Sequence, residues 1–154
     1  MVTGFQHLHN FLRWIIVILA VVTLIKSLSG LGGKKAFTNG DRKTALFLMI
    51  SADIQLLLGV ALYFMKGWSQ QWGNSGFMKN AVLRYWAMEH LVGMLLAIIL
   101  IHIGYSAAKS NRPAVAKFRR LFVCVLLAVI VAVAVMPWPG RPEGIAKPLF
   151  PGMH

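Results

Sequence analysis

Four long apolar runs dominate this 154-residue chain and constrain its fold more than any other feature. They cover about residues 11–31, 44–65, 85–108 and 118–136. A helix needs about 20 apolar residues to cross the ~30 Å hydrocarbon core of a bilayer, and each run is about that long. Because only helices and closed barrels can span a membrane, the sequence predicts an all-α integral membrane protein with four transmembrane helices.

The connectors between the runs are short and rich in turn residues, including Gly32-Gly33, Asn39-Gly40, the stretch 73–76 and Asn111-Arg112-Pro113. Short loops make successive helices antiparallel neighbours. We therefore expect residues 1–139 to form an up-down-up-down four-helix bundle, followed by a polar and flexible C-terminal tail at residues 140–154.

Basic residues outnumber acidic ones by 16 to 4, which gives the chain a formal net charge of +12. In a soluble protein this excess would suggest nucleic-acid binding, but here the basic residues lie between the apolar runs. They are better explained as topology signals, because cytoplasmic loops of membrane proteins are enriched in Lys and Arg. We therefore expect a lipid bilayer, and no nucleic acid, among the partners.

The distribution of the basic residues predicts the orientation. The first and third connectors, with the adjoining ends of the runs, hold ten: Lys26, Lys34, Lys35, Arg42, Lys43, Lys109, Arg112, Lys117, Arg119 and Arg120. The opposite side holds six: Arg13, Lys66, Lys79, Arg84, Arg141 and Lys147. The positive-inside rule then predicts a multi-pass protein of the cytoplasmic membrane with both termini outside.

The first run has a second interpretation. Arg13, the apolar stretch 14–25 and the polar stretch 27–29 also match the layout of a cleaved signal peptide. Cleavage there would leave three spans and would move the basic stretch 34–43 outward. We keep four spans as the prediction and cleavage as the alternative.

Polar residues gather where the first and third runs begin. They are His7, His9, Asn10, Arg13 and Trp14 in the first run, and Arg84, Trp86, Glu89 and His90 in the third. In an alternating bundle these two helices run in the same direction, so both groups lie at one height. One interpretation is a belt at headgroup depth, where such residues are common. The other is that His9 and His90 hold one ligand, whose acidic groups Arg13 or Arg84 neutralises.

A second polar level lies deeper. Asp53 is in the middle of the second run and His102 is near the end of the third, at depths that allow contact if the helices adjoin. An ionised carboxylate alone in lipid is very costly, so we expect Asp53 to face protein and to bond His102, with Ser51 and Gln55 nearby. The pair is either a hydrogen bond that holds two helices together or a proton relay or the polar end of a quinone pocket.

Histidines on facing membrane helices are typical of haem b sites, which need one imidazole on each side of the iron and cations near the propionates. His9 and His90 fit this pattern. His7 points about 200° away from His9 on a helix and replaces it only if the start of the span is irregular. His102 lies about 18 Å deeper than His90 at ~1.5 Å per residue, and its partner would have to be Met49, so we expect one haem.

Other chemistries have less support. A zinc or copper site made from His7, His9, Glu89 and His90 stays open, although Glu89 faces away from His90 and is expected to pair with an arginine. The single cysteine, Cys124, excludes a disulfide framework, an iron–sulfur cluster and a cysteine zinc site. No HExxH motif or phosphate-binding glycine loop occurs. The chain is therefore expected to be at most an electron-transfer component and not a hydrolase or transferase.

Three short motifs carry a resemblance to a known group. The run His9-Asn10-Phe11-Leu12-Arg13-Trp14, the segment 84–90 (RYWAMEH) and the exit Met136-Pro137-Trp138-Pro139 resemble those of small bacterial four-span proteins that are usually labelled cytochrome b-like. The resemblance covers about residues 5–139. It implies haem b and residence in the bacterial cytoplasmic membrane.

The sequence thus favours a cytochrome b-like membrane protein that carries electrons near the quinone pool or anchors a respiratory complex. The alternative is a structural subunit of a membrane complex without a cofactor, whose polar residues serve helix packing and docking. Quinone binding and homo-oligomerisation stay open.

The predicted orientation is testable by cysteine labelling. A cysteine introduced at Ser29 or Ser110 should not react with an impermeant thiol reagent added to intact cells, because both positions belong to the basic, cytoplasmic side. Efficient labelling at either position from outside would contradict the orientation.

Overall fold

The computed structural model describes residues 1–150, and no strand occurs among them. Its elements are α1 (Val2–Gly30), α2 (Asn39–Met65), two 3-10 helices (Trp68–Gly73 and Phe77–Lys79), α3 (Ala81–Arg84), a π-helical turn (Tyr85–Glu89), α4 (His90–Ala108) and α5 (Ala114–Val135). Helix α3, the π-helical turn and α4 form one continuous helix. Four helices are therefore long and apolar enough to cross a membrane, which confirms the predicted all-α bundle with four spans.

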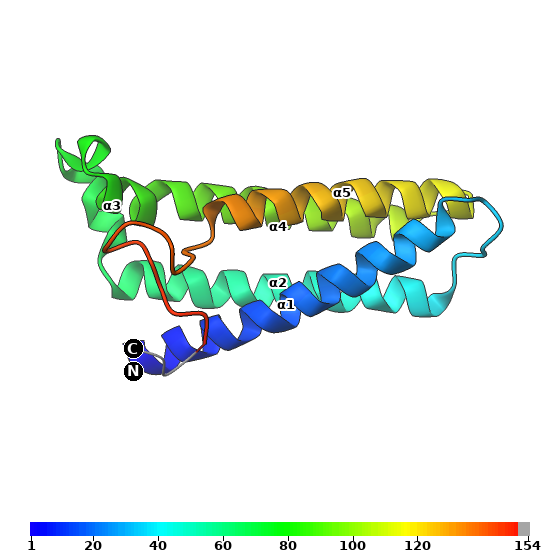
Figure 1. The fold of residues 1–154 in the computed structure, drawn as a ribbon, viewed down its shortest axis with the longest axis horizontal. Coiled ribbons are helices and arrows are strands. Elements are labelled where there is room, and N and C mark those ends of the chain that lie inside the picture. The colour runs from blue at the N-terminus through cyan, green and yellow to red at the C-terminus, as the bar shows by residue number, and fades with distance from the viewer. Residues whose placement is uncertain (151–154) are drawn as a thin grey trace.

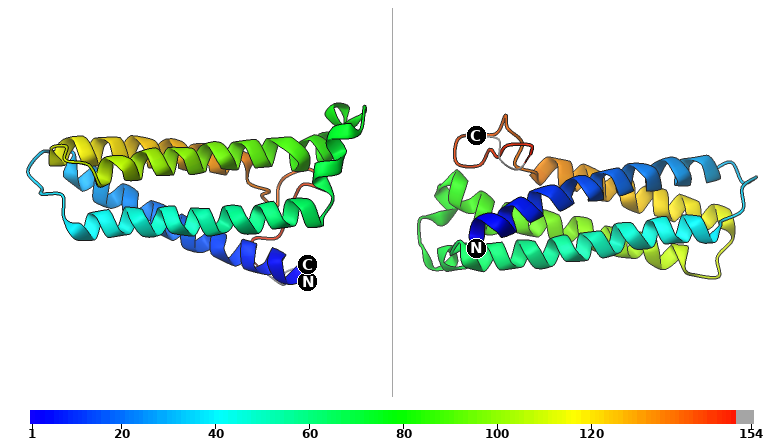
Figure 2. Two further views of the ribbon diagram at one scale, coloured as in Figure 1. Left: turned by 180° about the vertical axis from the view of Figure 1, so that it is seen from behind. Right: turned by 90° about the horizontal axis from the view of Figure 1, so that it is seen from below.

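The four long helices alternate in direction along a long, narrow bundle (Figures 1 and 2). Helix α1 packs against α2 and α5, and α4 packs against the same two helices, so α1 and α4 lie diagonally across the bundle. The N-terminus, the connector 66–80 and the segment 137–150 lie at one end, which we call the N-terminal end. The connectors 31–38 and 109–113 lie at the opposite end.

The helices begin before the apolar runs from which they were predicted, and they end within one residue of the ends of those runs. Helix α1 begins at Val2, well before residue 11, so His7 and His9 are both in regular helix. Helix α2 begins at Asn39 because Thr38 and Asp41 form a capping box. Apolar windows measure the hydrocarbon-spanning part of a helix, whereas capping residues set where the helix ends.

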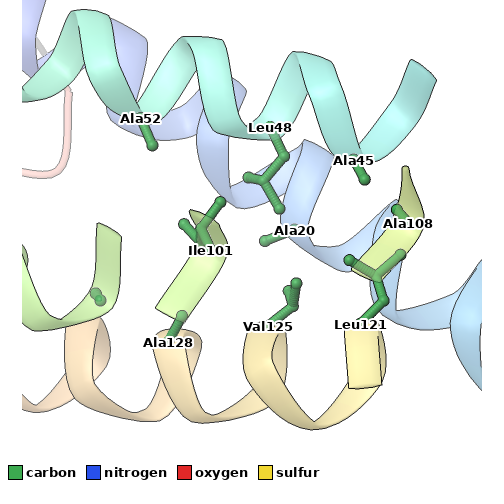
Figure 3. Packing of buried hydrophobic residues seen from close by; sticks show 10 residues of the cluster. Ala20, Ala45, Leu48, Ala52, Ile101, Ala108, Leu121, Val125 and Ala128 are labelled. Carbon is green, nitrogen blue, oxygen red and sulfur yellow. The ribbon is translucent and has the colours of Figure 1, made fainter. Parts of the chain in front are cut away.

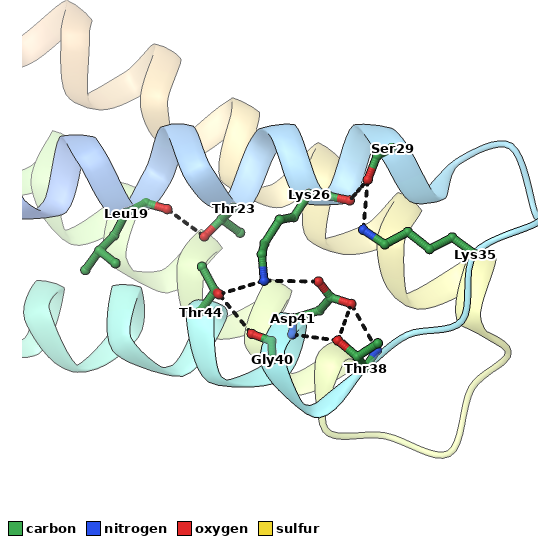
Figure 4. A network of polar contacts seen from close by, with 9 residues as sticks. All are labelled: Leu19, Thr23, Lys26, Ser29, Lys35, Thr38, Gly40, Asp41 and Thr44. Atoms are coloured by element: carbon green, nitrogen blue, oxygen red, sulfur yellow. Dashed lines mark hydrogen bonds and ion pairs between the residues drawn. The ribbon is translucent and has the colours of Figure 1, made fainter.

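A polar network ties α1 to the start of α2 at the opposite end (Figure 4). Lys26 Nζ lies 3.3 Å from an Asp41 carboxylate oxygen and 3.3 Å from Thr44 Oγ1. The second Asp41 oxygen accepts hydrogen bonds from the backbone N–H and the hydroxyl of Thr38, at 2.9 and 2.8 Å. One carboxylate therefore both caps α2 and holds it against α1.

Small side chains form the core in the half of the bundle near the opposite end (Figure 3). The buried apolar cluster contains Ala20, Ala45, Leu48, Ala52, Ala97, Ile101, Ala108, Leu121, Val125 and Ala128. Membrane helices are held by close van der Waals packing, which small residues permit. This half is therefore closely packed, and the open space in the bundle lies towards the N-terminal end.

Substitution of Gly30 tests this close packing. A Cβ at Gly30 would overlap the ring of Phe118, which is fully buried. We expect Gly30→Ala to lower the free energy of unfolding by about 1–3 kcal/mol relative to Gly4→Ala, because overpacking a filled site is destabilising. Both changes add the same helix propensity, and Gly4 has no atom within 4 Å of a Cβ. Unfolding in detergent followed by circular dichroism measures the difference, and equal stability would contradict the packing.

Candidate functional site

A cavity of about 540 Å³ lies between the four long helices in the N-terminal half of the bundle. Every long helix contributes to its wall, and residues 137–147 of the C-terminal segment close part of it. Its volume is within the ~300–1,000 Å³ that is usual for sites of small ligands and cofactors. The polar residues that line it are Gln6, His9, Asn10, Arg13, Gln55, Tyr63, Lys66, His90 and Lys147.

The wall of the cavity is charged at one end and apolar at the other. Its wall on α2 runs from Ala52 to Lys66, which is about 21 Å at ~1.5 Å per residue. All of its charged side chains are near the N-terminal end. Its deeper part is lined by apolar side chains, among them Ala20, Leu24 and Ile101. The shape therefore suits a ligand with an apolar body and a polar end.

His90 lines the cavity from α4 and is held by the backbone of α5. Its Nδ1 lies 2.9 Å from the carbonyl oxygen of Val135. A carbonyl can only accept, so Nδ1 carries the proton and Nε2 keeps its lone pair. The π-helical turn 85–89 immediately precedes His90, and the hydroxyl of Tyr85 donates to the same carbonyl at 2.6 Å. This imidazole is fixed in the tautomer that can bind a metal through Nε2.

His9 lines the cavity from α1, on the helix diagonal to α4. It packs against α2 where Gly59 provides space, since a Cβ there would come within 3.3 Å of His9 Cε1. The backbone carbonyl of His9 accepts a 3.0 Å hydrogen bond from Gln55 Nε2. The two histidines that the sequence predicted to share a site therefore line one cavity from opposite sides of the bundle.

Three buried polar atoms at this cavity lack a hydrogen-bond partner among residues 1–150. They are His9 Nδ1, Arg13 Nε and Gln55 Oε1. A buried polar group without a partner costs about 1–3 kcal/mol, and such groups usually mark an unseen water, ion or ligand. All three belong to residues that line the cavity, so the polar part of its wall is not fully satisfied within the chain.

The charge of the cavity is entirely basic. Arg13, Lys66 and Lys147 line it, whereas no carboxylate of residues 1–150 does. Asp41, Asp53 and Glu89 are each paired elsewhere, with Lys26, His102 and Arg84 respectively, and Glu143 is exposed on the C-terminal segment.

Lys66 lies just beyond the end of α2, where its charge is costly. Burial, together with the neighbouring charge of Lys147, lowers the pKa of the Lys66 ammonium. An anionic group bound in the cavity would oppose both effects and stabilise the charged amine.

The C-terminal segment contacts the bundle through hydrogen bonds and a buried side chain, whereas the sequence predicted a flexible tail at residues 140–154, of which the structure describes 140–150. The guanidinium of Arg13 and the indole N–H of Trp14 both donate to the carbonyl of Leu149, the latter at 2.9 Å. The indole N–H of Trp86 donates to the carbonyl of Gly144 at 2.8 Å, and Ile145 is buried. The prolines and glycines correctly indicated irregular backbone, but irregular backbone can still be fixed by long-range hydrogen bonds.

Several predicted site residues lie elsewhere. Arg84 donates to Glu89 at 2.6 Å and to the carbonyl of Met78, and it does not line the cavity. This confirms the expected pairing of Glu89 with an arginine and places Arg84 outside the cavity. His7 is exposed on α1 and is also absent from the cavity wall. His154 lies outside the described residues.

The alternative zinc or copper site does not assemble. Within residues 1–150, no three His, Cys, Asp or Glu side chains come together as metal ligands. Glu89 is engaged by Arg84, and His7 is exposed and does not line the cavity. His9 and His90 are the two histidines that line it.

Asp53 and His102 form a pair as predicted, but the pair faces away from the cavity. His102 Nε2 lies 2.8 Å from Asp53 Oδ1. The two side chains are 45% and 42% exposed and neither lines the cavity, so the pair is on the outside of the bundle. Gln55 is not near it, because residues two apart on a helix point about 200° apart. Met49 packs against the apolar core.

Sequence reasoning missed two lysines, Lys66 and Lys147, as cavity residues. Lys66 could have been found from its place at the end of the second run, at the height of His9. No local pattern in the sequence indicates that Lys147 folds back over the bundle. Comparison with protein-family models, with characterised proteins and with solved structures finds no match to this chain.

Docking of the C-terminal segment is testable by amide hydrogen exchange. The backbone N–H groups of Ile145, Ala146 and Lys147 donate to the carbonyls of Pro142 and Pro137, and Ile145 is the buried apolar anchor of the segment. Ile145→Ala should cost about 2 kcal/mol of local stability and speed exchange of these amides at least about tenfold. Glu143→Ala, which changes an exposed residue of the same segment, should exchange like the parent. Exchange in the parent as fast as in an unstructured peptide would contradict the docking.

Proposed function

We propose that this chain is a cytochrome b-like membrane protein in which His9 and His90 would hold haem b in the cavity. The observation that carries the proposal is the His90 imidazole, whose Nδ1–H is tied to the Val135 carbonyl while His9 lines the same cavity from the diagonal helix. Haem b, when bound, supplies reversible one-electron transfer at its iron.

A hydrogen bond from the second ring nitrogen prepares a histidine to bind a metal, and the bond from His90 to the Val135 carbonyl would act in this way. It fixes the ring orientation, keeps the proton on Nδ1 and raises the basicity of Nε2. Gln55 acts on the other side of the cavity by holding the backbone at His9. Both histidines are thus positioned by contacts to neighbouring helices.

The basic end of the cavity fits the two carboxylates of a haem. Arg13, Lys66 and Lys147 are the cations available to bind them, and no carboxylate among residues 1–150 competes at the cavity wall. Such pairs are strong when they are shielded from water, and the C-terminal segment covers this end. The apolar deep part would exclude water from the macrocycle.

We further propose that the protein resides in the bacterial cytoplasmic membrane with both termini outside. The ten-to-six distribution of Lys and Arg supports this orientation. The cavity would then open near the outer face, where electrons could pass between the quinone pool or a respiratory partner and the site. The resemblance of residues 84–90 and 136–139 to cytochrome b-like proteins supports the same role.

A second candidate function is that of a structural subunit without a cofactor. The outward-facing Asp53–His102 pair favours it, since intramembrane ionisable residues usually contact protein and not lipid. In that case the cavity would hold lipid, and the purified protein would be colourless.

Haem content separates the two candidates. The detergent-purified parent should show a Soret band and sharp reduced α and β bands. His9→Ala and His90→Ala should each lower bound haem per chain at least about tenfold, since loss of even a supporting contact costs 10–100-fold. His7→Ala removes an exposed histidine from the same helix and should keep full occupancy.

The helical content of each variant, measured by circular dichroism, distinguishes loss of haem from loss of fold. Full occupancy in His90→Ala would contradict the ligand assignment. Absence of haem from the parent, even after incubation with added haem, would overturn the proposal and favour the structural subunit.

A further inference from the structure

The Asp53–His102 pair is the least expected polar feature of this fold. It joins α2 to α4 through a 2.8 Å contact, and almost half of each side chain is exposed on the outside of the bundle. Apolar residues surround it on the same face: Ile50, Ile54, Leu57 and Ile99 are 42–70% exposed. The pair is therefore a polar island on a surface that is otherwise suited to lipid.

In a bilayer spanned by the four helices, the pair would lie inside the hydrocarbon core. His102 is six residues from the end of α4 at Ala108, or about 9 Å at ~1.5 Å per residue. Asp53 is near the middle of α2, twelve residues from Met65. Neither side chain is long enough to extend to the headgroups as Lys or Arg does. Lipid alone would leave the outer atoms of the pair without partners.

The pair offers the same hydrogen-bonding groups to its surroundings wherever the proton shared by Asp53 and His102 lies. Whether the shared proton lies on Asp53 Oδ1 or on His102 Nε2, Nδ1 of His102 carries a proton and Oδ2 of Asp53 can accept one. Neither Nδ1 nor Oδ2 has a hydrogen-bond partner within residues 1–150. The surface thus offers one donor and one acceptor side by side.

We propose that this face of α2 and α4 is the interface of a homodimer. A two-fold axis beside the pair would let His102 Nδ1–H of each copy donate to Asp53 Oδ2 of the other. An isologous interface requires such a self-complementary surface, and one donor next to one acceptor meets that requirement. A second copy therefore satisfies both atoms, and the inference does not depend on the proposed haem.

Cysteine cross-linking in native membranes tests the interface. In a Cys124→Ala background, Ile99→Cys places a thiol one turn before His102, whereas Ile18→Cys places one on the diagonal helix α1. Both parent residues are well exposed, at 55% and 61%. On mild oxidation, Ile99→Cys should form a disulfide-linked dimer of this chain and Ile18→Cys should not.

Co-expression of two variants supplies the decisive control. Asp53→Leu and His102→Leu each lose the internal bond and both contacts between copies. A mixed dimer of the two variants, however, regains one contact, from His102 of one chain to Asp53 of the other. With both variants expressed equally and isolated through two different affinity tags, the mixed cross-linked dimer should be about sixfold more abundant than either homodimer of variants. Random pairing alone gives about twofold, and one interhelical hydrogen bond of the usual strength in membranes adds about threefold.

Three results of these cross-linking experiments would overturn the homodimer. A mixed dimer only about twofold more abundant than either homodimer, as random pairing gives, would show that the pair serves only within one chain, and would overturn the proposal. Absence of a homodimer at Ile99→Cys, or a cross-link there to a different protein alone, would overturn it as well. Should the leucine variants fail to accumulate, the comparison of Ile99→Cys with Ile18→Cys in the otherwise unchanged chain decides.

Discussion

Close packing of small side chains in one half of the bundle is the constraint on which the other features depend. Ala45, Ala52, Ala97, Ala108 and Ala128 let the four helices approach in that half, and the carboxylate of Asp41 fixes α2 against α1 beyond it. At the N-terminal end α4 and α5 meet again where Gly93 packs against Val135, and the C-terminal segment covers this end. The space between these two regions is the cavity, so the alanine core determines its depth and its apolar floor.

The basic residues at the N-terminal end have different partners from those at the opposite end. At the opposite end Lys26 is neutralised within the chain by Asp41. At the cavity, no carboxylate of residues 1–150 pairs with Arg13, Lys66 or Lys147. Arg13 and Lys66 donate to carbonyl and amide oxygens, and Lys147 lies over the ring of Trp86. Because Asp41, Asp53 and Glu89 are paired elsewhere, the N-terminal end of the cavity keeps its positive charge. This charge favours an anionic group at that end, next to the apolar part of the cavity.

The spans, and the placement of His9 and His90 at one end of the bundle, could be predicted from the sequence, because apolar length and helix direction are local properties. The cavity wall at Lys147 could not, since it depends on contacts from Trp14 and Trp86 to backbone carbonyls more than 50 residues away. The depths of Asp53 and His102 in their spans correctly predicted that the two side chains meet. The direction of the pair was not predictable, because α2 and α4 are apolar on nearly every side and their sequences do not distinguish an inner from an outer face.

Helix α2 serves both polar levels, and its geometry explains why they face opposite ways. Gln55 reaches His9 in the cavity, while Asp53, two residues earlier, must point about 200° away and reach His102 on the outside. A rotation of α2 that buried Asp53 would withdraw Gln55 from the backbone of His9. The orientation that builds the cavity therefore forces a carboxylate onto the outer surface, and α4 supplies the histidine that makes this arrangement tolerable in a membrane.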